Sequence, residues 1–113
     1  MTSLSFNDWD LEKHVADAIG QLGWEEPTQI QVEAIPFARK GMDVVGQART
    51  GSGKTAAFGI PIIESCEPNG STQAIVLCPT RELAVQVAEE FQALQGKKGL
   101  RIETVYGLSL IHI

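Results

Sequence analysis

The most informative part of the sequence for the fold is Ala48-Arg49-Thr50-Gly51-Ser52-Gly53-Lys54-Thr55, which lies between a short apolar run and a helix-forming run. Its glycines let the backbone turn tightly and point successive N–H groups inward, which forms a nest for an anion. The helix that follows adds the positive end of its dipole. The stretch matches the phosphate-binding loop G-x-x-x-x-G-K-[ST] except at Ala48. We therefore expect Lys54 to reach the β- and γ-phosphates of a nucleotide and the Thr55 hydroxyl to ligate Mg²⁺.

Three short segments around this loop have the composition of strands. Val44–Gly46 is a short apolar run that leads into the loop. Ala74–Cys78 is a continuous apolar run, which is typical of a parallel strand covered on both faces. Arg101–Tyr106 alternates polar and apolar residues. With helical segments between them, the order is β-α-β-α-β, which predicts an α/β fold with a parallel, doubly wound sheet flanked by helices.

Apolar spacing predicts four helices, over about residues 10–22, 28–35, 54–65 and 80–95. Gly23 is placed to end the first of them in a left-handed conformation. Thr28 and Gln31 have the spacing of a capping box, and Pro36 is expected to kink or end the helix that they begin. Thr80 is expected to cap the last helix. The helices that precede the phosphate-binding loop therefore form a region of their own.

The composition is that of a globular chain with no membrane span. Hydrophobic residues make up 43% and charged residues 20% of the 113 residues, a length that allows one domain at most. No apolar run approaches the roughly 20 residues that cross a bilayer. The N-terminus has no pattern of a secretion signal, and Cys66 and Cys78 form no metal-binding pattern. These features favour an intracellular, cytoplasmic location.

Three further segments narrow the class of phosphate-binding loop. They are the lone aromatic Phe6, the run Gly23-Trp24-x-x-Pro27-Thr28-x-Ile30-Gln31, and Pro79-Thr80-Arg81-Glu82-Leu83-Ala84. Together with the loop they resemble the isolated aromatic, the Q motif, motif I and motif Ia of the DEAD-box ATP-dependent RNA helicases. Motif I of that family carries alanine where this chain has Ala48. The resemblance covers roughly residues 4 to 107.

The resemblance implies a domain organisation. Residues 1–41 would form an N-terminal Q-motif helical region, and residues 42–107 would form part of a RecA-like ATP-binding lobe. The last residues, 108–113, match nothing in the family pattern. The D-E-A-D motif, the S-A-T motif and the second RecA-like lobe have no counterpart in the sequence. We therefore interpret the chain as a fragment of the first lobe, whose uncovered strand faces predict low stability in isolation.

The resemblance also implies roles for residues that would bind ATP. Gln31 would recognise the adenine edge through its side-chain amide, which donates and accepts at once, as adenine's N6 and N7 require. Phe6 would stack on the adenine ring. Residues 48–55 would hold the phosphates, with Lys54 and Thr55 as the catalytic residues and Mg²⁺ on Thr55. Two structural alternatives are that Gln31 only closes the capping box and that Phe6 only packs on the first helix.

Motif Ia would contact RNA. In the family, the segment that corresponds to Pro79, Thr80, Arg81 and Glu82 holds the RNA sugar-phosphate backbone, which positions RNA without reading its sequence. A helix N-terminus with an arginine suits a phosphate. The formal net charge of −5 means that any such contact is local. The alternatives are a simple N-cap for Thr80 and a solvated cation for Arg81, and Lys97-Lys98 is expected to be a solvated turn.

Three functions are compatible with these motifs. The first is the N-terminal, ATP-binding part of an ATP-dependent RNA helicase, for which catalysis by this chain alone is uncertain because acidic groups that hold Mg²⁺ and orient water are missing. The second is a nucleotide-binding module that does not hydrolyse ATP. The third, another class of phosphate-binding-loop enzyme, leaves the segments 23–31 and 79–84 unexplained.

Overall fold

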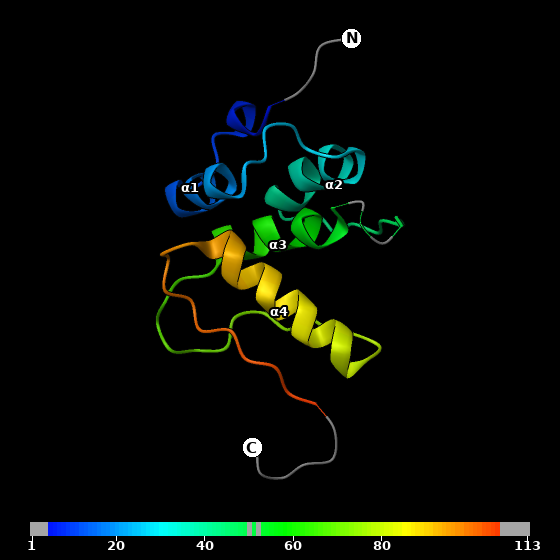
Figure 1. The fold of residues 1–113 in the computed structure, drawn as a ribbon, viewed down its shortest axis with the longest axis vertical. Coiled ribbons are helices and arrows are strands. Elements are labelled where there is room, and N and C mark those ends of the chain that lie inside the picture. The colour runs from blue at the N-terminus through cyan, green and yellow to red at the C-terminus, as the bar shows by residue number, and fades with distance from the viewer. Residues whose placement is uncertain (1–4, 50, 52, 107–113) are drawn as a thin grey trace.

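In the computed structural model, the described residues are 5–49, 51 and 53–106, and they form one short 3-10 helix and four α-helices (Figure 1). The elements are η1 (Phe6–Trp9), α1 (Lys13–Leu22), α2 (Gln29–Arg39), α3 (Lys54–Ser65) and α4 (Arg81–Gln95). The predictions for Thr50, Ser52 and residues 107–113 lie outside the described residues.

The predicted helix signals are confirmed at three ends. Gly23 ends α1 with a left-handed φ of 78°. Thr28 begins α2, and its backbone N–H donates to Gln31 Oε1 at 2.9 Å. Thr80 caps α4, because its hydroxyl oxygen accepts a hydrogen bond from the Leu83 N–H at 3.1 Å. Side-chain caps act over three residues, so the sequence alone was enough to place them.

Two helix predictions are wrong in part. The first helix begins at Lys13, because residues 6–9 form the separate helix η1 and the chain then turns at Asp10, which is left-handed with φ 53° and ψ 55°. Pro36 does not end α2, which continues to Arg39. A proline in a helix removes one backbone donor. Ile35, the residue before it, is fully buried, and the free energy gained from this burial favours the helix despite the missing donor.

The predicted strands do not form in the described residues, so the parallel sheet is not confirmed there. Many of their apolar side chains are exposed instead: Val45 is fully exposed, Leu77 is 90% exposed and Val105 is 76% exposed, while Cys78 and Ile102 pack against the helical core. The physical reason is that a parallel strand needs neighbouring strands for its hydrogen bonds and covering layers for both faces. The sequence of one apolar segment does not reveal whether neighbouring strands and covering layers are present.

Helix α3 lies at the centre of the fold, between α2 and α4 (Figure 1). Helix α1 packs on α4 and also contacts α3. The fully or nearly fully buried side chains come from all four α-helices and η1; the largest hydrophobic ones are Phe6, Val15, Ile19, Ile35, Ile60, Ile63, Phe91 and Leu94. This packing fixes the start of α3, where the phosphate-binding loop ends, against the N-terminal region.

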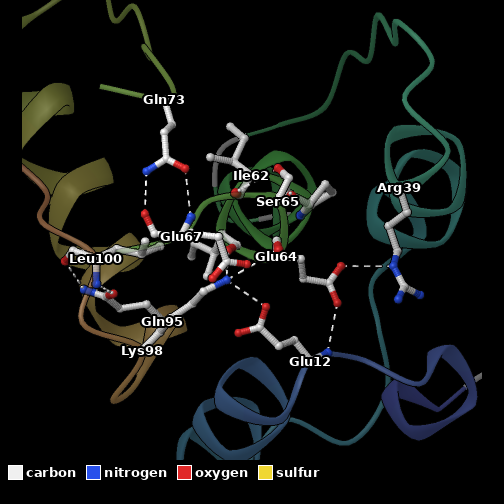
Figure 2. Close-up of polar contacts among 12 residues, drawn as sticks. Glu12, Arg39, Ile62, Glu64, Ser65, Glu67, Gln73, Gln95, Lys98 and Leu100 are labelled. Carbon is white, nitrogen blue, oxygen red and sulfur yellow. Dashed lines mark hydrogen bonds and ion pairs between the residues drawn. The ribbon is translucent and has the colours of Figure 1, made fainter. Parts of the chain in front are cut away.

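The prediction of a solvated Lys97-Lys98 turn is wrong for Lys98, which is only 8% exposed. Its ammonium donates to Glu12 Oε2 at 2.7 Å and to the Ile63 carbonyl at 2.6 Å (Figure 2). The turn after α4 returns to the C-terminal end of α3, where carbonyl groups without helical partners attract a cation. Lys98 thereby connects the ends of α3 and α4 to the residue that precedes α1.

Replacing Glu12 with alanine is expected to lower the free energy of unfolding by about 2 kcal/mol, because the buried Lys98 ammonium would keep only carbonyl partners. Urea unfolding measures the change. Asp17→Ala is the matched control, since it removes a carboxylate from an equally short ion pair, to Lys13 at 2.8 Å, that is exposed. Equal losses for the two variants would contradict a stabilising role for the Glu12–Lys98 pair.

Candidate nucleotide-binding site

A cavity of about 750 Å³ lies between the N-terminal region and the start of α3. Phe6, Trp24 and Gln31 line it from the N-terminal side, and Lys54 and Thr55 line it from the first turn of α3. Another part of the cavity is lined by Pro79, which precedes α4, and by Leu83 in the first turn of α4. The structure thus brings residues of all four predicted motif regions to one cavity. A second cavity, of about 520 Å³, shares Phe6 and Trp24 but contains no residue of the phosphate-binding loop.

Gln31 joins α2 to the phosphate-binding loop. Its side chain is 2% exposed; Oε1 accepts from the Thr28 N–H at 2.9 Å and Nε2 donates to the Gly53 carbonyl at 3.1 Å. The capping box is therefore present, and the amide binds the loop as well. An amide has two N–H donors and two acceptor lone pairs. One donor and one lone pair remain after these two hydrogen bonds, and these are what the recognition of adenine would require.

Gly53 is the residue on which α2 and the loop converge. Its φ is 84°, and it is the N-cap of α3. A Cβ atom at this position would lie 2.5 Å from Gln31 Nε2 and 2.7 Å from Thr28 Oγ1. Glycine is therefore needed both for the left-handed backbone and for the close approach of Gln31. Gly51 has the same φ of 84° but nothing within 4 Å of a Cβ atom.

Lys54 and Thr55 begin α3, and both face the cavity. The exposed Lys54 ammonium donates to the Ala48 carbonyl at 3.3 Å, so the lysine lies over the loop that precedes it. Left-handed glycines at 51 and 53, the N-terminus of a 12-residue helix and an adjacent lysine form a site of positive potential. This arrangement fits the phosphates of a nucleotide, while ligation of Mg²⁺ by the Thr55 hydroxyl stays a prediction.

Phe6 packs within a cluster of aromatic rings. It is 5% exposed, and its ring lies 6.1 Å from Trp24 in a stacked geometry and 5.7 Å from Trp9 in an edge-on geometry. Packing on the N-terminal helices, the structural alternative for Phe6, is therefore present. Because Phe6 also lines the cavity, contact with adenine stays a prediction. The place of Trp9 in this cluster was not predicted from the sequence, because a single aromatic residue in a short 3-10 helix belongs to no recognisable spacing pattern.

The motif Ia segment lies at the N-terminus of α4. Thr80 acts as the N-cap, as its structural alternative proposed, while Pro79, Arg81 and Glu82 are exposed. The Arg81 guanidinium lies 5.0 Å from the centre of the Tyr106 ring, so a cation–π contact orients it. RNA binding by this segment stays a prediction. No sequence signal pairs Arg81 with a ring 25 residues away along the chain.

A family model described as DEAD/DEAH box helicase matches residues 28–111, which is most of the chain. The chain belongs to the DEAD/DEAH box helicase family. The matched range includes Gln31, the phosphate-binding loop and the motif Ia segment, so the resemblance to DEAD-box helicases that the motifs predicted is confirmed.

Similar DEAD-box proteins come from archaea, bacteria and eukaryotes. The chain is 47% identical over 110 residues to a protein named probable ATP-dependent RNA helicase from Methanocaldococcus jannaschii, covering 96% of this chain and 30% of that protein. It is 45% identical over 106 residues to the DEAD-box ATP-dependent RNA helicase CshA of Bacillus subtilis, covering 93% of this chain and 22% of CshA. The chain therefore spans less than a third of the length of these relatives.

Solved structures of DEAD-box proteins share this fold. The crystal structure of a DEAD box protein from Methanococcus jannaschii superposes with a TM-score of 0.90 at 45% identity, over 98% of this chain and 31% of that chain. The RNA helicase Prp28 from Chaetomium thermophilum, solved bound to ADP, superposes with a TM-score of 0.82 at 32% identity, over 99% of this chain and 29% of that chain. These neighbours have RecA-like helicase domains. Among the described residues of this family member, no helix has the length and apolar character to cross a membrane.

Proposed function

We propose that this chain is the ATP-binding, N-terminal part of the first RecA-like lobe of an ATP-dependent RNA helicase. The observation that carries the proposal is the hydrogen bond from the Gln31 amide to the Gly53 carbonyl, at 3.1 Å. It places a side chain suited to adenine directly against the loop suited to phosphates. A single nucleotide can therefore contact both, which a phosphate-binding loop without the segment before it would not provide.

Each motif has one role in this proposal. Phe6 and Gln31 contact adenine, and residues 48–55 hold the phosphates with Lys54 as the charged ligand. Thr55 ligates Mg²⁺, which supplies charge neutralisation on the phosphoryl oxygens. Exposed groups of residues 79–82 hold an RNA phosphate at the N-terminus of α4, and Arg81 supplies the charge. The presence of ADP in the Prp28 structure supports a nucleotide in this type of domain.

The parallel sheet belongs to the same proposal. The apolar segments Val44–Gly46, Ala74–Cys78 and Arg101–Tyr106 are proposed to pair as parallel strands when neighbouring strands cover them. Their exposed side chains support this, since the free energy gained from burial grows with apolar area. A TM-score of 0.90 with a DEAD box protein supports it further, because the segments follow the course of that chain.

Nucleotide titration of the chain tests the proposed site. ATP with Mg²⁺ is expected to bind with saturation and at least about 10-fold more tightly than GTP, because guanine has the O6 acceptor where adenine has the N6 donor, so that Gln31 would lose one of its two hydrogen bonds to the base. Equal binding of ATP and GTP would contradict base recognition by Gln31. Absence of any saturable nucleotide binding would favour an inert segment over a binding module.

Hydrolysis requires the remainder of a helicase, so a chimera tests the coupling to RNA. In this chimera, the present chain replaces the segment of Bacillus subtilis CshA that it matches. ATP turnover that rises on addition of single-stranded RNA is expected. ATP binding without RNA-stimulated turnover would support the non-hydrolysing nucleotide-binding module instead. Intact CshA, assayed in parallel, is the positive control.

A further inference from the structure

Arg39, the last residue of α2, contacts two other segments of the chain, and Figure 2 shows one of these contacts, the ion pair with Glu64. Its two terminal nitrogens donate to the backbone carbonyls of Trp9 and Asp10, and its Nε forms an ion pair with Glu64 Oε1 at 3.0 Å. The Glu64 side chain is 13% exposed and the Arg39 side chain is 31% exposed, so the carboxylate of this pair is the partner that is shielded from water. One guanidinium thus uses all of its nitrogens to join α2, the end of η1 and the end of α3.

The two carbonyls that Arg39 binds flank an unusual backbone position. Asp10 is the single non-glycine residue with a positive φ among the residues that the structure describes. Such a conformation is disfavoured for an L-residue and persists where surrounding contacts determine it. Glu64 adds a third contact, because its Oε2 accepts from the Glu12 N–H at 3.0 Å. The Arg39–Glu64 pair therefore fixes the backbone at residues 9, 10 and 12.

This fixed turn determines where η1 lies, and η1 carries two rings of the aromatic cluster. Phe6 begins η1 and Trp9 ends it. The Phe6 ring stacks on the Trp24 ring, and both residues line the cavity. The same two helices that supply Arg39 and Glu64 at their C-terminal ends supply Gln31 and Lys54 at their N-terminal ends. Arg39 and Glu64 themselves do not line the cavity.

We infer that Arg39 and Glu64 are positioning residues for adenine recognition, acting through the turn at Asp10 on the aromatic cluster of Phe6, Trp9 and Trp24. The inference rests on the proposed function of the cavity as an ATP site. According to this inference, loss of the Arg39–Glu64 pair weakens the binding of the adenine base but not the binding of the phosphates. The phosphate-binding half depends on the loop and on α3, whose first turn the pair does not contact.

The test compares ATP with inorganic tripolyphosphate on the full chain. Arg39→Met keeps the alkyl stem but removes every donor, and it is expected to weaken ATP binding by about 5-fold while tripolyphosphate binding stays unchanged. Glu64→Gln is expected to act in the same direction. The matched control is Arg101→Met, which makes the same charge change at a side chain that is 86% exposed, and it is expected to leave both affinities unchanged.

Tryptophan fluorescence gives a second readout, because the two tryptophans of the chain are both in the cluster with Phe6. Arg39→Met is expected to shift the emission to longer wavelength and to reduce its change on addition of ATP. An equal loss of ATP and tripolyphosphate affinity, or no loss of either, would overturn the positioning role. If the unmodified chain bound ATP no better than GTP, the proposed function itself would be wrong, which is a separate result.

Discussion

Lys54→Ala is expected to abolish the RNA-stimulated ATPase of the CshA chimera, with turnover reduced by at least about 100-fold. The ammonium at the start of α3 is the charge nearest to the place where the loop would hold the β- and γ-phosphates. Charge develops on those oxygens during phosphoryl transfer, and a fixed cation in a site that excludes water stabilises it strongly. Turnover is measured at saturating Mg²⁺-ATP, with and without single-stranded RNA.

This variant separates chemistry from folding. Lys54 is exposed, and its ammonium makes a long hydrogen bond of 3.3 Å to the Ala48 carbonyl, so its loss is expected to leave the thermal midpoint within about two degrees. Lys40→Ala is the control, since Lys40 is an exposed lysine at the C-terminal end of α2 that does not line the cavity. Turnover by Lys54→Ala equal to that of Lys40→Ala would refute the assignment of the loop.

The parts of the fold that the sequence predicted depend on short-range signals. The caps at Thr28 and Thr80 and the stop at Gly23 act over at most three or four residues, so their outcome can be read from local spacing. The strands are different. The apolar composition of a run such as Ala74–Cys78 predicts that it is buried, but it does not identify the neighbouring strands or helices that would cover it. The structure leaves Leu77 in that run 90% exposed.

The polar contacts that hold the site were not predictable for a related reason. Lys97 and Lys98 are adjacent in a glycine-flanked turn, and only the return of that turn to the end of α3 makes one exposed and the other buried. Arg39 likewise follows a proline in an ordinary helical segment, and its partner Glu64 is 25 residues away. Long-range pairs of this kind follow from packing, which a single sequence does not reveal.

At the site itself, the residue types were predictable and their connection was not. The spacing of Thr28 and Gln31 indicated a cap, and the family resemblance indicated adenine recognition. The structure adds that the same amide binds the Gly53 carbonyl, so that capping and loop geometry depend on the one side chain for which adenine recognition is proposed. A mutation in the loop should therefore affect the N-terminal region, and this can be tested directly.

Gly53→Ala is expected to lower the free energy of unfolding by roughly 3 kcal/mol and to reduce ATP affinity severely. The new Cβ would lie 2.5 Å from Gln31 Nε2 and 2.7 Å from Thr28 Oγ1, so the Gln31 amide must leave its hydrogen bond to residue 53. Because Gln31 is 2% exposed, a displaced amide has no water to replace that partner. Urea unfolding and ATP titration measure the two effects.

Gly51→Ala isolates the cause of the loss in stability. Gly51 and Gly53 share a φ of 84°, but an added Cβ at Gly51 meets nothing within 4 Å, so this control contains only the backbone strain of about 1 kcal/mol. The difference between the two variants is then the cost of separating Gln31 from the loop. In a Gln31→Ala background that difference should shrink, since the amide that clashes is gone. Equal destabilisation by the two glycine variants would show that the loop and the N-terminal region are not coupled through Gln31.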